Sequence, residues 1–144
     1  DKPYKVGYIS WVVDLFHIGH LNMFKRAKEQ CRYLIVGVVS DEGVRLNKQA
    51  EPFVPFDERI EMVRSCKYVD EAIKLPLDFC GTRDMFKIFH FDVQFSGSDY
   101  EHDPAWLAEK EFLEKNGSTM VFFPYTQSTS STKLKRAIEN RINN

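Results

Sequence analysis

The sequence predicts an α/β fold, in which a doubly wound sheet of five parallel strands forms a single domain over residues 1–144. Short apolar runs alternate along the chain with longer segments whose apolar residues have helical spacing. The intervals between these runs suit βαβ units, whose right-handed crossovers put helices on both faces of a parallel sheet. A chain of 144 residues is long enough for one such domain and short for two.

The individual elements follow from local patterns. Residues 33–39 (YLIVGVV) are continuously apolar and rich in β-branched side chains, which is typical of a strand covered on both faces. Residues 21–30 place apolar side chains on one helical face. Pro104 and Gly117 suit the first turn and the end of another helix. The predicted order is strand 4–9, helix 21–30, strand 33–39, helix 57–66, strand 71–75, helix 84–90, strand 93–96, helix 104–115, strand 120–123 and helix 131–142.

A Rossmann-like sheet of this kind binds its ligand beyond the carboxyl ends of the strands, at the point where the strand order reverses. Function is therefore expected in loops that follow strands. Three such loops carry informative residues, at 10–20, 41–59 and 124–132.

Composition limits the classes of function. The 20 Lys and Arg nearly balance the 21 Asp and Glu, so binding to nucleic acid is not expected as the main task. We expect neither a signal peptide nor a transmembrane segment, because no apolar run approaches the roughly 20 residues that a membrane helix needs. The three cysteines (Cys31, Cys66 and Cys80) resemble neither a disulfide framework nor a zinc site, which favours a reducing, cytoplasmic compartment.

The first loop contains the strongest chemical pattern. His17 and His20 are three residues apart, so one helical turn presents both on the same side. Gly19 has no Cβ and lets a ligand approach the backbone. The N-terminus of the following helix adds unpaired N–H groups and partial positive charge. These features predict a pocket for phosphate oxygens, whereas zinc is disfavoured because no third ligand stands at a familiar spacing.

A run of hydroxyl side chains occupies residues 128–132, directly before the last predicted helix. One Ser or Thr would suffice to cap that helix. The longer run therefore predicts a second phosphate site at a helix N-terminus.

The chain resembles the H-x-G-H nucleotidyltransferase superfamily, and in particular its cytidylyltransferase branch. That branch includes glycerol-3-phosphate, ethanolamine-phosphate and choline-phosphate cytidylyltransferases. The resemblance rests on His-Ile-Gly-His after a strand and on further matches in family order, at residues 33–38, 40–42, 58–59, 67–71 and 130–133. This ordered set covers most of the chain and is far more specific than H-x-G-H alone.

The resemblance implies transfer of CMP from CTP to a small phosphorylated alcohol, with glycerol 3-phosphate as the first candidate. The acceptor phosphate attacks the α-phosphorus directly, so the protein supplies positioning and charge stabilisation rather than a nucleophile. Mg²⁺ is implied as the companion of the triphosphate, and a homodimer as the assembly. Two alternatives stay open, an adenylyltransferase of the same superfamily and a nucleotide-binding domain with little catalysis.

The resemblance also assigns residues to roles. It implies catalytic roles for His17, His20 and Lys48, and contacts with the acceptor phosphate for Arg59 and Lys67. Nucleotide contacts are implied for Trp11, Val12, Asp14, Gly19, Gly97, Asp99, Thr126, Ser130, Ser131 and Thr132. Structural alternatives stay open for some of them: Asp14 as a helix cap, Arg59 in an internal ion pair, and Gly97 in an ordinary turn.

The chain departs from the family pattern around the triphosphate site. Trp11 stands where the family has Gly, and Tyr125 stands where it has a phosphate-binding Arg. The other replacements are Val13, Ala50, Ser98 and Ser128. Nearby basic residues could supply some of the missing charge, namely Arg45, Lys133, Lys135 and Arg136.

Overall fold

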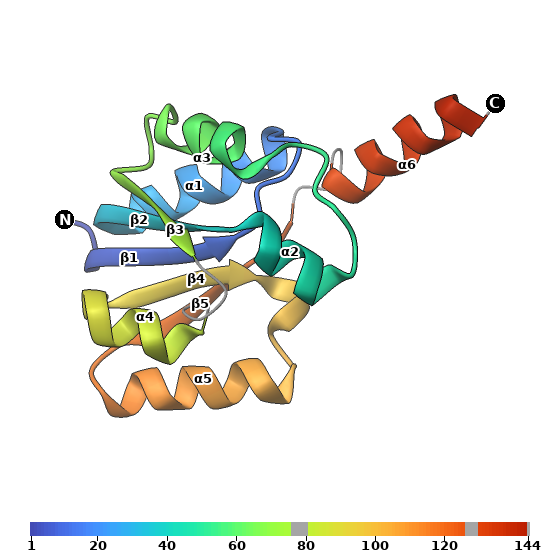
Figure 1. Cartoon of the computed structure of the whole chain (residues 1–144). Coiled ribbons are helices and arrows are strands. Elements are labelled where there is room, and N and C mark those ends of the chain that lie inside the picture. Colours follow the sequence, from blue (N-terminus) through green and yellow to red (C-terminus); the bar gives the residue numbers. More distant parts are fainter. Residues whose placement is uncertain (76–80, 126–129, 144) are drawn as a thin grey trace.

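The computed structural model describes residues 1–75, 81–125 and 130–143. Five strands form one parallel sheet in the order β3-β2-β1-β4-β5 (Figure 1). They are β1 (Tyr4–Trp11), β2 (Cys31–Val39), β3 (Glu71–Leu75), β4 (Val93–Gly97) and β5 (Thr119–Phe123). The order reverses between β1 and β4, which confirms the predicted doubly wound α/β fold.

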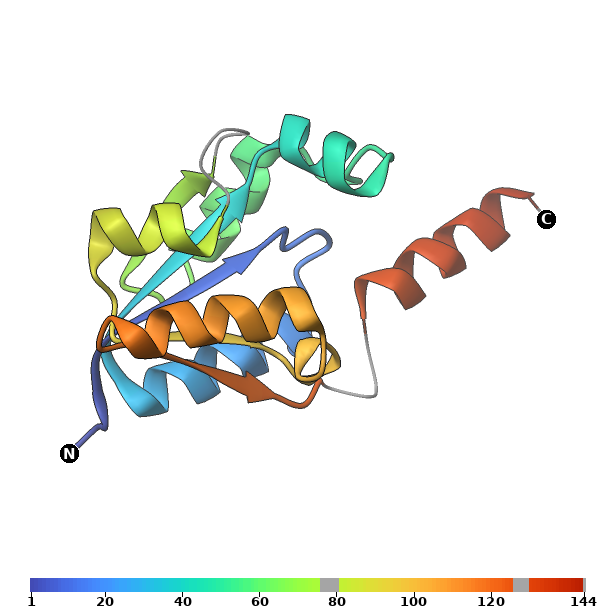
Figure 2. The ribbon, with the colours of Figure 1, turned by 90° about the horizontal axis from the view of Figure 1, so that it is seen from below.

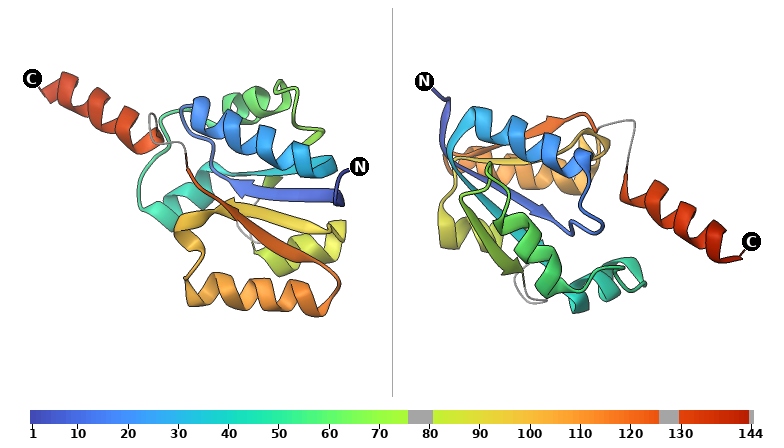
Figure 3. Two further views of the ribbon diagram at one scale, coloured as in Figure 1. Left: turned by 180° about the vertical axis from the view of Figure 1, so that it is seen from behind. Right: turned by 90° about the horizontal axis from the view of Figure 1, so that it is seen from above.

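Helices cover both faces of the sheet (Figures 1 and 3). One face carries α1 (Ile18–Gln30) and α3 (Phe56–Arg64), and the other carries α4 (Thr82–Phe89) and α5 (Pro104–Lys115). Phe24 of α1 and Val63 of α3 are fully buried in the first core, whereas Met85 of α4 and Leu113 of α5 are buried in the second. The alternation of strands and helices thus produces two separate apolar layers.

The strands β1 and β4 separate toward their carboxyl ends. β1 pairs with β4 at Gly7 and Tyr8, but it pairs with β2 as far as Trp11. Beyond Tyr8 the side of β1 that faces β4 is therefore unpaired. This opening lies at the reversal of strand order, which is where a Rossmann-like sheet holds its ligand.

One helix was not expected from the sequence. The segment after β2 forms α2 (Asp41–Lys48), where a loop over residues 41–59 was predicted. Ser40 caps this helix by accepting a hydrogen bond from the Gly43 amide at 3.1 Å. The helix has only two turns and contains Gly43 and Asn47, both weak helix formers, so periodicity gave no signal.

The last helix, α6 (Ser131–Asn143), extends away from the body of the domain (Figures 1 and 2). Its first turn reaches the carboxyl end of the sheet, but none of its residues is buried. Across the part of the chain that the structure describes, no helix combines the length and the apolar character that crossing a bilayer requires.

Candidate active site

A pocket of about 680 Å³ lies at the carboxyl end of the sheet, between the diverging ends of β1 and β4. The loop after β1, the start of α1, the end of α2 and the start of α6 contribute its walls. The structure brings together most of the residues singled out in the sequence, namely Trp11, Val12, Asp14, His17, Gly19, His20, Lys48, Gly97, Asp99, Ser130, Ser131 and Thr132. Thr126, which the sequence also singles out, lies outside the described residues.

His17 is the N-cap of α1. Its Nδ1 accepts a hydrogen bond from the Gly19 amide at 3.0 Å, so Nδ1 carries no hydrogen and the neutral ring is protonated at Nε2. That Nε2–H donates to Ser131 Oγ at 3.2 Å, and the Ser131 hydroxyl donates to the carbonyl of Asp14. The backbone of α1 thus fixes the tautomer of His17 and directs its one N–H toward α6.

His20 is held in the same tautomer. Its Nδ1 accepts from the His17 amide at 3.1 Å, which leaves Nε2 as the protonated nitrogen. The ring is only 2% exposed and packs against Trp11, Phe16 and His17 at centroid distances of 4.6, 5.7 and 3.9 Å. Burial lowers the pKa of His20 to about 3 and also lowers that of His17. Both histidines are therefore neutral hydrogen-bond donors at neutral pH.

The low pKa of His20 predicts a pH-dependent stability. The unfolded chain binds a proton at His20 below about pH 6.5, but the folded chain does not until about pH 3, so stability falls as the pH drops through this range. We expect His20 to account for a loss of about 2 kcal/mol between pH 6.5 and pH 5. Urea unfolding of the wild type and of His20→Asn at both pH values measures this loss of stability.

His90→Asn is the matched control for this experiment, because His90 is exposed and its left-handed backbone suits Asn. This variant should keep the wild-type dependence on pH. A His20→Asn variant that loses as much stability as the wild type at low pH would contradict the assignment.

Asp14 organises the loop around the pocket. Its carboxylate accepts from the Phe53 amide at 2.9 Å and the Val54 amide at 3.0 Å, and it pairs with Lys135 of α6 at 2.7 Å. Burial alone would raise the pKa of Asp14, but the hydrogen bonds from Lys135 and from these amides outweigh it and lower the pKa. The helix-cap alternative for Asp14 is wrong, because His17 caps α1.

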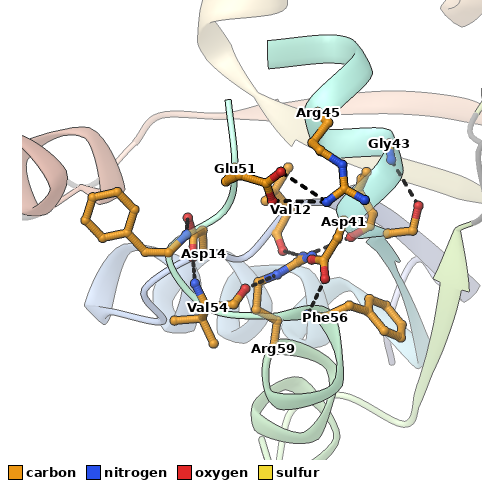
Figure 4. Close-up of polar contacts among 12 residues, drawn as sticks. Val12, Asp14, Asp41, Gly43, Arg45, Glu51, Val54, Phe56 and Arg59 are labelled. Carbon is orange, nitrogen blue, oxygen red and sulfur yellow. Dashed lines mark hydrogen bonds and ion pairs between the residues drawn. The ribbon is translucent and has the colours of Figure 1, made fainter. Parts of the chain in front are cut away.

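Arg59 is fully buried beneath this loop (Figure 4). Its guanidinium donates to the carbonyls of Val12, Val39 and Val54 at 2.7 to 2.9 Å and pairs with Asp41 at 2.6 Å. The internal ion pair that the sequence left open is thus present. The structure does not support the implied contact of Arg59 with the acceptor phosphate. The guanidinium is buried, and all three of its nitrogens already have protein partners.

Two residues between β1 and α1 have left-handed backbone conformations. The φ angles of Val13 and Leu15 are 56° and 53°, which L side chains rarely adopt and which cost on the order of 1–3 kcal/mol each. They flank Asp14, and Arg59 holds the carbonyl of the preceding Val12. The contacts of Asp14 and Arg59 therefore offset the strain of this loop.

The two lysines assigned from the resemblance lie in different places. Lys48 is the last residue of α2 and lines the pocket, where partial desolvation and the nearby Lys135 lower its pKa. Lys67 lies between α3 and β3, at the amino end of the sheet, with its ammonium 5.2 Å from the ring centroid of Tyr68. The structure does not bring Lys67 to the pocket, because a residue that precedes a parallel strand lies at the opposite edge.

Arg45, a candidate for replacing missing charge, pairs with Glu51 (Figure 4).

Aromatic residues form the remaining wall, and of these sequence reasoning missed Trp106. The Tyr125 ring covers Gly97 so closely that a Cβ on Gly97 would clash with it. Trp11 packs against His20 and lies 6.4 Å from Tyr125, so it flanks the pocket. Tyr100 and Trp106 stack at 4.5 Å and also line it. Tyr100 belongs to the same loop as Gly97 and Asp99, for which the resemblance implies nucleotide contacts, whereas Trp106 lies on α5 and had no such signal.

A sequence profile described as cytidylyltransferase-like matches residues 12–137 of the chain. The chain belongs to the cytidylyltransferase-like family. Its relatives carry the names of nucleotidyltransferases with different substrates, so family membership establishes the class of enzyme but leaves the substrate open.

Three relatives show this range. The FAD synthase of Thermococcus kodakarensis is 35% identical over 139 residues, which cover 93% of this chain and 89% of that protein. The ethanolamine-phosphate cytidylyltransferase of Dictyostelium discoideum is 33% identical over 141 residues, 96% of this chain but 39% of that protein. The glycerol-3-phosphate cytidylyltransferase of Staphylococcus aureus is 32% identical over 126 residues, 87% of this chain and 88% of that protein.

Among solved structures, a lipopolysaccharide core biosynthesis protein from Thermoplasma volcanium has a similar fold. The TM-score is 0.67 at 23% identity, and the match covers 88% of this chain and 99% of the other. This likeness supports the Rossmann-like architecture.

Proposed function

We propose that this cytidylyltransferase-like protein transfers CMP from CTP to a small phosphorylated alcohol, with glycerol 3-phosphate as the first candidate. The observation that carries the proposal is the pair of neutral imidazoles, His17 and His20, each held with one Nε2–H beside a shared pocket. The similarity to a glycerol-3-phosphate cytidylyltransferase over 88% of that protein supports this choice of acceptor.

In this reaction an oxygen of the acceptor phosphate forms a bond to the α-phosphorus while the bond from that phosphorus to the β-phosphate oxygen breaks. Pyrophosphate leaves with the bonding electron pair, and no covalent enzyme intermediate forms. His17 and His20 would donate hydrogen bonds to the α-phosphoryl oxygens as negative charge crowds there. Lys48, Lys135 and the N-termini of α1 and α6 would attract the rest of the triphosphate.

Mg²⁺ would accompany the triphosphate and neutralise part of its charge. Among the described residues, no group of three His, Cys, Asp or Glu side chains could hold a metal ion. Of the two lining carboxylates, Asp14 already accepts hydrogen bonds at both oxygens, whereas Asp99 is exposed at the rim. The pocket therefore suits an ion that is bound mainly by the phosphates. Asp99, whose carboxylate also hydrogen-bonds with the Tyr125 side chain, would be its protein oxygen ligand.

Adenylyl transfer to a planar acceptor is the second candidate. The aromatic wall of Trp11, Tyr100, Trp106 and Tyr125 favours it, because flat rings stack well on such side chains. The FAD synthase of Thermococcus kodakarensis, which this chain matches over 89% of its length, is also consistent with this alternative.

A pyrophosphate-release screen tests both candidates. Each nucleoside triphosphate is combined with glycerol 3-phosphate, ethanolamine phosphate, choline phosphate and a flavin phosphate. Release that requires CTP and a phosphorylated alcohol would support the proposal, and release that requires ATP and the flavin would favour the alternative. Tight nucleotide binding without release for any pair would overturn both and indicate a binding domain with little catalysis.

We also propose a cytoplasmic location, because the buried thiols of Cys31 and Cys66 are free and suit a reducing compartment. The homodimer implied by the family resemblance is likewise a proposal.

A further inference from the structure

Two aromatic rings bound the opening between the ends of β1 and β4. Trp11 is the last residue of β1, and the Tyr125 ring, which follows β5, lies over Gly97 at the end of β4. The centroids of the Trp11 and Tyr125 rings are 6.4 Å apart, and the ring planes are inclined at 41°. Both side chains line the pocket, so a ligand that enters this opening meets both rings.

The two rings differ in how firmly they are held. Trp11 makes edge contacts with His20 at 4.6 Å and with the fully buried Phe24 at 5.9 Å, so protein packs against its ring from two sides. Tyr125 is 38% exposed, and its hydroxyl donates a hydrogen bond to the carboxylate of Asp99 at the rim of the pocket. Burial raises the pKa of Tyr125, so the phenol keeps the proton for this bond at neutral pH. Trp11 is thus the fixed ring of the pair, and Tyr125 is the ring that can turn.

The separation of the rings suits a flat group between them. Stacked aromatic groups lie about 3.5 Å apart, so a ring held between two others needs a separation of about 7 Å. The observed 6.4 Å is slightly smaller, and the tilt must decrease before both rings can stack on a ligand. A small turn of the Tyr125 ring supplies both changes.

The neighbours of the pair indicate which flat group belongs there. The Trp11 ring contacts that of His20, the centroid of His20 lies 3.9 Å from that of His17, and His17 contacts Ser131 at the start of α6. A nucleoside triphosphate has its parts in the same order, from the base through the α-phosphate to the outer phosphates. The two rings are at the end of this series that lies away from the phosphate-binding hydroxyls, which is the place of the base.

We propose that Trp11 and Tyr125 form an aromatic clamp for the base of the nucleotide, and that the hydrogen bond to Asp99 orients the Tyr125 ring. The proposal rests on the proposed function, because it takes the ligand of the pocket to be a nucleoside triphosphate. It goes further in assigning part of the affinity to an uncharged ring and in naming Tyr125 as a residue that binds it. Tyr100 and Trp106 stack on each other and are not part of the clamp.

Calorimetric titrations with two kinds of ligand test the aromatic clamp. CTP and ATP carry a base, whereas inorganic tripolyphosphate carries the phosphates alone. Tyr125→Leu removes the flat ring and should weaken the binding of both nucleotides on the order of tenfold to a hundredfold, with the binding of tripolyphosphate unchanged. Tyr125→Phe keeps the ring but loses the hydroxyl, so its nucleotide affinity should lie between those of the wild type and Tyr125→Leu.

Tyr33→Leu is the matched control. Tyr33 is 40% exposed, and its hydroxyl donates a hydrogen bond to the Glu71 carboxylate at 2.7 Å, but it lies near the amino end of β2 and outside the pocket. This variant should bind the nucleotides and tripolyphosphate as the wild type does. Circular dichroism checks that all variants fold.

The fluorescence of Trp11 gives a second readout. The chain has two tryptophans, so Trp106→Phe leaves Trp11 as the single tryptophan while keeping an aromatic ring at position 106. CTP or ATP should quench the Trp11 emission by stacking on the ring, and tripolyphosphate should not.

The proposal is overturned if Tyr125→Leu weakens nucleotides and tripolyphosphate equally or weakens neither, or if tripolyphosphate quenches Trp11 as strongly as CTP and ATP do. It is also overturned if a flavin phosphate, and neither nucleotide, requires Tyr125 for binding, because the rings would then hold an acceptor. These readouts need no turnover. Base-dependent binding through Tyr125 without pyrophosphate release would keep the aromatic clamp and reject the transferase, whereas release by an enzyme whose nucleotide affinity ignores Tyr125→Leu would do the opposite.

Discussion

The variants His17→Ala and His20→Ala are each expected to lower turnover by about 10²–10³-fold. In each ring Nδ1 accepts a backbone amide, which leaves one Nε2–H as the donor to the charge that builds up on the α-phosphoryl group. The Nε2–H of His17 would exchange its partner Ser131 Oγ for a phosphoryl oxygen when the nucleotide binds. Removing that donor leaves the charge without its partner at the moment of transfer. The rate of pyrophosphate release, measured with the nucleotide and acceptor that the screen identifies, gives the effect.

The variant His17→Asn separates the chemistry from the architecture. Asn is a good N-cap, so this variant should keep α1 capped while its short side chain cannot replace Nε2. His17→Ala should additionally lose about 1 kcal/mol of stability as the cap disappears. If either alanine variant or His17→Asn retained near-full turnover, the transition-state role would be rejected.

The largest expected loss of stability is that of Arg59→Met, at about 3–5 kcal/mol. The substitution keeps an apolar stem but leaves Asp41 without its cation and removes donors from the carbonyls of Val12, Val39 and Val54. Urea unfolding at neutral pH measures the change, with the transition midpoint expected to fall at an unaltered slope. Binding of the nucleotide should weaken as well, because Val12 lines the pocket.

Arg64→Met on the same helix is the control for Arg59→Met. Arg64 is exposed, so its replacement should change the free energy of unfolding by no more than about 0.5 kcal/mol. Equal midpoints for the two variants would show that the buried network around Arg59 contributes little.

The sheet could be predicted because its strands are short, continuous and apolar, a pattern that depends on local sequence alone. The helix α2 could not, because its stability comes from the Ser40 cap and from Val44 packing in the second core rather than from periodicity. A cap also explains why the start of α1 was misplaced by three residues. Sequence reasoning treated His17 only as a phosphate-binding residue, but His17 is also the N-cap of the helix.

The pocket could be predicted because loops that follow parallel strands converge on one edge of the sheet. That rule, applied strictly, would have excluded Lys67, which precedes its strand. The buried position of Arg59 could not be read from sequence, since it depends on three carbonyls supplied by distant segments. Lys135 was noted for its charge, but its pairing with Asp14 required the three-dimensional placement of α6.

The left-handed residues Val13 and Leu15 have a consequence for ligand binding. A loop that already holds an unfavourable backbone conformation before any anion arrives is preorganised, so the ligand does not bear the entropic cost of ordering it. The affinity is then determined by the contacts made and by desolvation, without a further entropic cost of ordering the loop. The backbone strain at these two residues lowers the stability of the domain, but it reduces the free-energy cost of binding the substrate.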